Sequence, residues 1–266
     1  MTKNLVAQPD AGDAKSCLRL LSYNIQVGIG SSRPRHYVTQ SWKHVLPHSK
    51  SFDNLDRIAR LFASYDVVGL QETDAGSLRT GFINQTEYLA DKSDFPFWYD
   101  QTNRKLGKMA QHSIGFLSKI KPVDVHEHKL PGLIPGRGAM LVRYGRMDNP
   151  LVLILIHLAL GKRARLSQLD YISDIVNQFE HVIVMGDLNC KPGSPEMDWL
   201  FRKTKLSEPL EELHTFPSWR PIRNIDHILV TPTLVVKEMN VLNHSFSDHL
   251  PIAMEIELPA GIHILG

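Results

Sequence analysis

Carboxylate, amide and imidazole side chains stand at the ends of several apolar segments of this 266-residue chain. Such groups are costly to bury without partners, so their recurrence at segment ends suggests that they serve one another. If the segment ends converge, these side chains form one polar pocket at the rim of a sheet core. The set comprises Asn24, Glu72, His157, Asp187, Asn189, Asp226, Asp248 and His249.

The oxygen donors in this set suit a hard divalent cation. Glu72 and Asp248 are carboxylates, and Asn24 adds an amide oxygen, which are the ligands that Mg²⁺ and Mn²⁺ prefer. The sequence lacks the clustered His and Cys residues that zinc favours. Two imidazoles and the carboxylate of Asp187 remain for proton transfer and phosphate contact. Together these groups are suited to the hydrolysis of a phosphate ester.

Each of these residues also has a structural alternative when it is considered alone. Asn24 could end a strand, Glu72 could cap the next segment, and His157 could be a buried core histidine. Asp187 follows a glycine and could belong to a turn. In an extended segment His227 should point opposite to the residue before it, so we assign it a structural role.

Strand-like and helix-like segments alternate along the chain and must position these side chains. Apolar periodicity predicts helices over 54–65, 163–179 and 194–204. It predicts strands over 18–27, 66–72, 112–119, 138–145, 151–158, 181–189, 225–230, 233–242 and 251–258. This pattern favours one large α/β domain with sheets packed face to face and helices outside. Residues 28–53 show no sustained period and are predicted to form a long loop.

The composition sets further limits on the class of protein. The chain is 42% hydrophobic and 22% charged, and its net charge of +2 does not by itself name a nucleic-acid partner. Cys17 and Cys190 show no spacing typical of a disulfide framework or metal site, which favours free thiols in the cytoplasm. We expect residues 1–16 to be a flexible lead-in and 17–266 a single domain. No secretory signal or membrane span is visible, and no obligate protein partner is indicated.

Six short motifs occur in order between residues 22 and 252: SYNIQ, LQETD, HLALG, GDLN, IDHILV and SDHLPI. Together they resemble the endonuclease/exonuclease/phosphatase superfamily, which includes DNase I-like nucleases, abasic-site endonucleases, inositol polyphosphate 5-phosphatases and neutral sphingomyelinases. The resemblance implies a four-layer α/β sandwich, in which helices flank two central mixed β-sheets. It also implies a divalent-metal-dependent phosphoesterase.

The resemblance further implies a cation site and a paired histidine. Glu72 is expected to ligate Mg²⁺ or Mn²⁺, with Asn24 and Asp248 near it. Asp226 is expected to pair with His249 and to hold its ring towards the scissile phosphate. The side-by-side Asp248 and His249 would thus face the metal and the phosphate respectively.

The same resemblance implies roles for the remaining candidates and reveals two departures. Asp187 would orient or deprotonate the attacking water, and Asn189 and His157 would contact the non-bridging phosphate oxygens. Gln26 stands where abasic-site endonucleases have an Asp. Ile114 stands where many members carry an Asn that helps to line the site.

Three functions stay open at this point. A nuclease is favoured slightly, with substrate contacts from Arg33, Arg35, Lys43, Arg137 and Trp219. The second function is a phosphatase or phospholipase that acts on a small phosphoester or a lipid headgroup. The third is a non-catalytic binding module, which the loss of a motif residue would favour, and none is lost.

Overall fold

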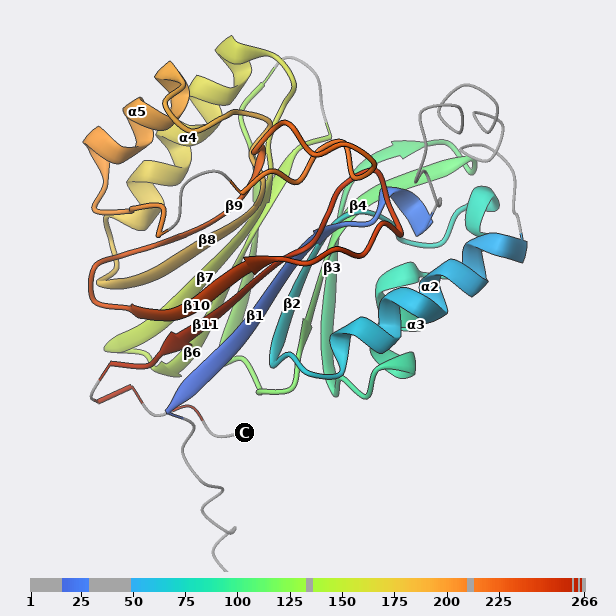
Figure 1. Cartoon of the computed structure of the whole chain (residues 1–266), viewed down its shortest axis with the longest axis horizontal. Coiled ribbons are helices and arrows are strands. Elements are labelled where there is room, and N and C mark those ends of the chain that lie inside the picture. Colours follow the sequence, from blue (N-terminus) through green and yellow to red (C-terminus); the bar gives the residue numbers. More distant parts are fainter. Residues whose placement is uncertain are drawn as a thin grey trace, which may run out of the picture.

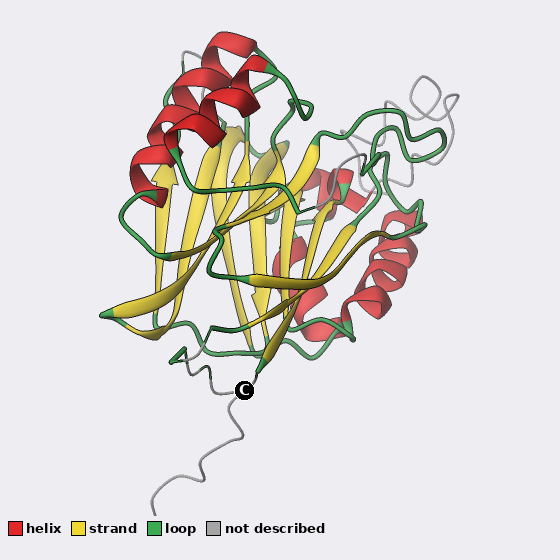
Figure 2. Ribbon diagram, turned by 60° about the vertical axis from the view of Figure 1, so that its left-hand side comes forward, coloured by secondary structure: helices red, strands yellow, loops and turns green. Residues whose placement is uncertain are grey.

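The computed structural model describes residues 16–28, 49–132, 136–209, 213–259, 261–262 and 264. Two β-sheets pack face to face, and helices cover the outer face of each sheet (Figures 1 and 2). This arrangement is the four-layer α/β sandwich that the sequence predicts. No helix among these residues is long and apolar enough to cross a membrane.

The first sheet has six strands in the order β10-β11-β1-β2-β4-β3. The strands are β1 (Cys17–Asn24), β2 (Val67–Asp74), β3 (Phe97–Leu106), β4 (Ala110–Ser118), β10 (Val235–Val241) and β11 (Ile252–Glu257). Only β1 and β2 are parallel neighbours, and the other pairs are antiparallel. Since Asn24 pairs with Gln71, the two parallel strands bring Asn24 and Glu72 to the same end of the sheet.

The second sheet has five strands in the order β5-β6-β7-β8-β9. The strands are β5 (Asp124–Lys129), β6 (Gly138–Arg146), β7 (Asn149–His157), β8 (His181–Asp187) and β9 (Asp226–Val230). β7 and β8 are parallel, with His157 paired to Asp187, and Asp187 is paired to Asp226 across β8 and β9. The register therefore places these three residues in a row at one end of the sheet.

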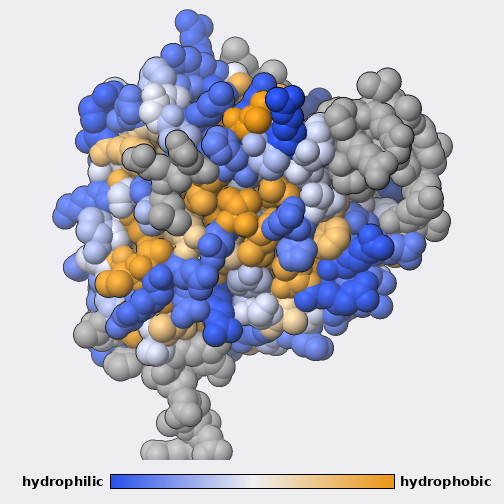
Figure 3. Space-filling model, viewed as in Figure 1, coloured by the Kyte–Doolittle hydropathy of each residue, from blue (hydrophilic) through white to orange (hydrophobic). Residues whose placement is uncertain are grey.

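Three apolar clusters hold the layers together. The central cluster lies between the sheets and includes Phe116, Leu153 and Met185. Ile114 is fully buried in the same cluster, so it packs as a core residue where many family members carry Asn. The outer clusters lie under two helix pairs: α2 (Ser49–Phe62) with α3 (Gln85–Lys92), and α4 (Lys162–Val176) with α5 (Pro195–Lys203). On the face seen in Figure 3, hydrophilic residues predominate where these helices lie, as expected of amphipathic helices.

The structure corrects the expected elements in three respects. The helix predicted from residue 54 begins at Ser49, so the predicted loop 28–53 is wrong for its last five residues. The strand predicted over 18–27 ends at Asn24, and a 3-10 helix, η1 (Gln26–Gly28), follows it and takes in the first residue of that loop. Residues 29–48 of that loop lie outside the described part of the chain. The sequence analysis also missed α3, β3 and β5. β3 and β5 are edge strands rich in polar residues, which lack the apolar alternation used to recognise strands.

Candidate active site

The candidate residues of the two sheets converge at one end of the sandwich. The amide Nδ2 of Asn24 donates to Oδ2 of Asp187 at 3.2 Å, which joins β1 to β8 across the sheets. Nε2 of His157 lies 3.5 Å from Oδ2 of Asp187 and 3.9 Å from Oε1 of Glu72. Side chains from strands far apart in the sequence therefore form one polar site, as the sequence analysis expected.

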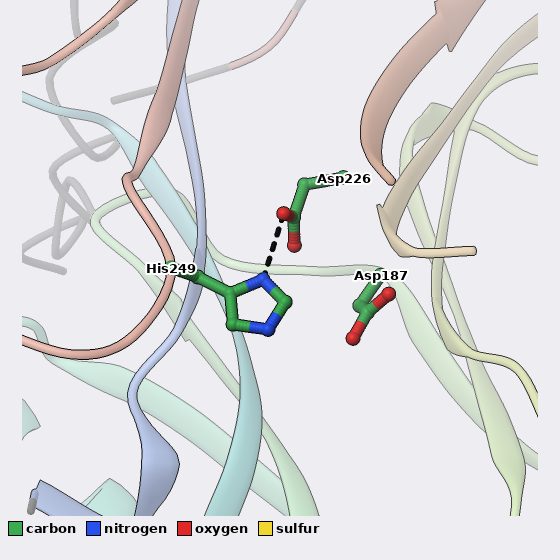
Figure 4. A group of neighbouring side chains, drawn as sticks. All are labelled: Asp187, Asp226 and His249. Carbon is green, nitrogen blue, oxygen red and sulfur yellow. Dashed lines mark hydrogen bonds and ion pairs between the residues drawn. The ribbon is translucent and has the colours of Figure 1, made fainter. Parts of the chain in front are cut away.

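Asp226 and His249 form a buried pair. Nδ1 of His249 lies 2.8 Å from Oδ2 of Asp226, and the Thr215 hydroxyl donates to the same oxygen at 2.5 Å. The Phe216 ring packs on the imidazole with 4.8 Å between centroids. Figure 4 shows the edge of the imidazole that carries its second nitrogen turned towards Asp187. The paired carboxylate and the aromatic ring thus fix one orientation of His249.

The ends of β2 and β8 have unusual backbone conformations that position the site. Glu72 has a φ of 55°, next to an irregularity in the pairing of β2 with β4 between Leu70 and Thr73. Positive φ is uncommon for residues other than glycine and persists where the surrounding structure imposes it. Gly186 has a φ of 141°, and a Cβ there would lie 1.9 Å from the carbonyl oxygen of Ile156. Only glycine therefore fits directly before Asp187.

Asn189 lies in the loop after β8 and has a left-handed backbone conformation, with a φ of 53°. Its backbone N–H donates to Oδ1 of Asp187 at 2.9 Å, and its side-chain amide donates to the carbonyl oxygen of Leu158 at 3.0 Å. The loop after β8 is therefore tied to the end of β7. These bonds hold Asn189 beside the Asp187 carboxylate.

The surroundings raise the pKa of both groups that face each other in Figure 4, the His249 imidazole and the Asp187 carboxylate. Burial alone would lower the pKa of His249, but Asp226, followed by Asp187 and Asp248, outweighs it and raises this pKa to about 10. Burial and then repulsion from Asp226 raise the pKa of Asp187 to about 7. The imidazole is therefore a cation at neutral pH, while Asp187 can gain or lose a proton there.

Glu72 lies close to a further carboxylate, that of Asp248, and such crowding of negative charge is typical of a cation site. Burial and then repulsion from Asp248 raise the pKa of Glu72, although 38% of its side chain is accessible. His249 and the Asn24 side chain act in the opposite direction. A divalent cation beside these oxygen donors would relieve the repulsion, so the residues fit Mg²⁺ or Mn²⁺.

A second group of possible ligands is made by Asp187, Asp226 and His249, whose ligand atoms all lie within 4.8 Å of one another. Asp226 is already engaged by His249 and Thr215 through one oxygen. Its charge is therefore partly compensated, whereas the ring nitrogen that lies 3.9 Å from Oε1 of Glu72 belongs to the neutral His157. The Glu72 position is the better candidate for a cation.

His157 and Arg137 contact each other at the edge of the site. Nη1 of Arg137 lies 2.7 Å from Nε2 and 2.8 Å from Nδ1 of the His157 ring. Burial and then the charge of Arg137 lower the pKa of His157 well below its usual value. His157 is therefore a neutral imidazole at neutral pH, and it can serve as a hydrogen-bond donor to an anion without carrying charge.

Two further predicted site residues, Asp248 and Trp219, lie in the described part of the chain, whereas three predicted substrate contacts do not. Asp248 is 4% exposed, and its carbonyl oxygen accepts a 2.7 Å bond from the N–H of Ser218. Trp219, the next residue in that loop, is partly buried. The predicted substrate contacts Arg33, Arg35 and Lys43 lie outside the described residues.

Thr215 and Phe216 belong to the site but were missed in the sequence. They stand in the segment HTFPSW, ten or more residues before Asp226, with no motif to mark them. The backbone of Thr215 also accepts from the N–H of Leu250 at 2.9 Å. The loop therefore holds both partners of the histidine pair, a relation that only the tertiary structure reveals.

His227 has the structural role that its position beside Asp226 predicts. Its Nδ1 lies 2.7 Å from Oε1 of Glu208, and its Nε2 lies 2.8 Å from the carbonyl oxygen of Cys190. Burial would lower the pKa of His227, but Glu208 and then Cys190 outweigh it and raise this pKa. The pair therefore stabilises the loop behind the site through a buried imidazolium.

We expect Glu208→Gln to destabilise the fold by about 3 kcal/mol at pH 6, because it leaves a buried charge without its partner. A raised histidine pKa contributes stability fully below the unfolded value of about 6.5. That contribution is lost as the pH rises through the folded-state pKa, so the effect of the substitution should shrink in alkaline solution. Denaturant unfolding at pH 6 and pH 9 measures both effects, with the exposed Glu127→Gln as control. A constant difference at the two pH values would contradict the ion pair.

Comparisons with solved structures show the same fold in several proteins. An endonuclease/exonuclease/phosphatase family protein of Bacteroides thetaiotaomicron has a TM-score of 0.70 and 17% identity, over 91% of this chain and 98% of that one. A mannosyl-6-phosphatase of the same organism has a TM-score of 0.67 and 17% identity, over 90% and 99%. The human Nocturnin catalytic domain with bound sulfate has a TM-score of 0.67 and 17% identity, over 92% and 95%.

Sequence comparison identifies the family directly. No curated protein matches the chain. The model of the Endonuclease/Exonuclease/phosphatase family, however, matches residues 21–249, which include every motif residue of the candidate site. The chain therefore belongs to the endonuclease/exonuclease/phosphatase family of hydrolytic phosphoesterases.

Proposed function

We propose that the protein hydrolyses phosphodiester bonds with an activated water and a divalent cation, and that its substrate is a nucleic acid. The observation that carries the proposal is the buried Asp226–His249 pair beside the Asp187 carboxylate. This arrangement supplies a fixed cationic donor and a carboxylate that exchanges a proton near neutral pH. Both groups can promote hydrolysis of a phosphate ester, the carboxylate by accepting a proton from water and the cation by stabilising charge on the phosphate.

Glu72, Asn24 and Asp248 are the residues that would hold the cation, Mg²⁺ or Mn²⁺. When bound, the cation would offset the negative charge that develops on the phosphate oxygens. The positive φ of Glu72 at the irregular end of β2 supports this role, because such a conformation persists where the surrounding structure imposes it. Repulsion between Glu72 and the Asp248 carboxylate would be relieved by a cation bound at this position.

The proton and the phosphate are handled by the residues of β7, β8 and the C-terminal loop. Asp187 would orient the attacking water and accept its proton, since its raised pKa permits both states at neutral pH. His249, held by Asp226, would donate to the scissile phosphate. Asn189 and the neutral His157 would donate to the non-bridging oxygens.

The preference for nucleic acid is supported by the loop that contacts the histidine pair. Arg220 and Arg223 are exposed on it, and the Arg223 guanidinium lies 6.0 Å from the ring centre of Phe216. Phe216 in turn packs on His249, so the exposed cations lie on the same loop as a residue of the site. Trp219 in this loop could stack on a base. Cations and aromatic side chains together are typical of surfaces that bind single strands.

A small phosphoester is the second candidate substrate. One of the proteins with a similar structure is named as a mannosyl-6-phosphatase, so the same fold occurs in an enzyme named for that activity. We also propose a cytoplasmic location, because the described Cys17 and Cys190 are free thiols.

A substrate panel tests the proposal. Plasmid DNA, RNA, abasic duplex, inositol phosphates, mannose 6-phosphate and phospholipid vesicles are each incubated with Mg²⁺, Mn²⁺ or chelator. Cation-dependent cleavage of DNA or RNA is expected, and the Asp187→Asn protein should lose it. Activity confined to sugar phosphates would favour the second candidate. No hydrolysis of any ester with either cation would contradict the proposed function.

A further inference from the structure

Two arginines stand together on the side of the site where β3, β4 and β6 meet. Arg137 precedes β6 and contacts the His157 ring. Arg104 lies near the end of β3, where it pairs in register with His112 of β4. We refer to Arg104 and Arg137 as the arginine pair. The charges of Glu72 and then Asp187 raise the pKa of Arg137, so both carboxylates lie near enough to act on it.

Two glycines allow the members of the arginine pair to approach each other. A Cβ on Gly136 would lie 3.0 Å from Cβ and 3.1 Å from Cδ of Arg104, so the Arg104 stem lies directly on the Gly136 backbone. A Cβ on Gly138 would lie 2.0 Å from Oδ1 of Asn103. The glycines on both sides of Arg137 thus let β3 side chains pack against the start of β6. Because backbone and side chains are closely packed here, the fold itself fixes the position of the Arg104 stem beside Arg137.

The charges of the arginine pair are not neutralised by a carboxylate at ion-pair distance among the described residues. Asp74, whose strand neighbour is His112, cannot serve, because its carboxylate already accepts six hydrogen bonds. One of these is a 2.6 Å bond from Nε of Arg79. Burial, then the charge of Arg79, and to a smaller extent Arg104 and Arg137, lower the pKa of His112 to about 4. A local excess of positive charge therefore lies beside the site.

Like charges held together by packing favour an anion between them. Burial is the main cause that lowers the pKa of Arg137, and repulsion from Arg104 acts in the same direction. A phosphate placed against both guanidiniums would relieve this repulsion and accept several charge-assisted hydrogen bonds. Arg137 contacts His157, and Arg104 packs on the backbone of the preceding Gly136, so Arg104 would extend the positive surface away from His157.

We infer that the arginine pair binds a second phosphate group of the substrate, next to the one that is hydrolysed. The inference rests on the proposed function and narrows its substrate to esters that carry two phosphates. The second phosphate could come from the next nucleotide of a strand or from a small bisphosphate. Arg104 would determine this preference, while Arg137 would contact both groups.

Matched substrates with one and two phosphates test the inference. The thymidine dinucleotide is compared with the same dinucleotide phosphorylated at its 5′ or 3′ end, and fructose 6-phosphate with fructose 1,6-bisphosphate. The wild-type protein should favour the member with the additional phosphate in one of these sets. The set in which the preference appears distinguishes a nucleic acid from a small bisphosphate.

Arg104→Gln is the decisive variant, with Lys105→Gln as its matched control. Both residues are exposed cations on β3, but Lys105 is the next residue along the strand and points to the opposite face. Loss of a charge-assisted contact should raise KM for the doubly phosphorylated substrate by about tenfold or more. Turnover of the singly phosphorylated substrate should stay nearly unchanged in both variants.

Two results would overturn the inference, and they differ from failure of the proposed function. The first is wild-type hydrolysis of both members of every set with equal kcat/KM. The second is an equal effect of Arg104→Gln and Lys105→Gln. If no substrate in the panel or the matched sets is hydrolysed by the wild-type protein, the proposed function itself fails and the inference with it.

Discussion

Glu72→Gln should reduce turnover by on the order of a thousandfold and weaken cation binding in parallel, since several kcal/mol of charge stabilisation depend on the cation. The substitution keeps the size of the side chain but removes its charge. Glu72 lies among Asn24, Asp248 and His157, where the described residues offer no thiolate to replace it. Calorimetric titration with Mg²⁺ or Mn²⁺ and steady-state kinetics measure the two effects on the same protein.

The control for this variant is Glu87→Gln, which makes the same change at an exposed position of α3. It should keep both cation affinity and turnover. Because Glu72 has a positive φ, melting temperatures must show that the variant retains its fold. Full hydrolysis in excess chelator, or lost turnover with unchanged cation affinity, would show that Glu72 is not the principal ligand.

The layers of the fold could be predicted from the sequence because the central strands are apolar runs. The segment at 151–158 becomes β7, whose residues Leu151–Ile156 are fully buried between neighbours of the same sheet. β3 has no such run: its later residues, Asn103 to Leu106, are polar or exposed. An edge strand gains its partner from only one side, so its own pattern carries little information.

The convergence of the candidate residues could be predicted because chemistry and strand position coincide in their motifs. Asn24 and Asp187, for example, close two separate strands and meet at 3.2 Å across the sheets. Thr215 and Arg104 could not be predicted in this way. A hydroxyl that holds Asp226 and a guanidinium that lies on Gly136 acquire these partners only through tertiary packing. No spacing along the chain encodes such contacts.

His249→Ala should lower turnover by on the order of 10² to 10⁴, the range for groups that act on a proton or charge in the transition state. Asp226→Asn should cost nearly as much, because Asp226 fixes the ring and its charge helps to raise the pKa of His249 to about 10. NMR titration of His249 in Asp226→Asn should show a lower pKa. The exposed His214→Ala, next to Thr215, is the control and should keep wild-type turnover.

The double variant distinguishes a functional pair from a structural salt bridge. Groups that act as a unit give non-additive losses, so the double variant should be about as slow as His249→Ala alone. A salt bridge that only stabilised the fold would instead lower the melting temperature and leave turnover of the folded protein intact. Losses that multiply would show that Asp226 and His249 act independently. Wild-type turnover in His249→Ala would remove this histidine from the catalytic mechanism, because the proposed reaction depends on its cationic ring beside the phosphate.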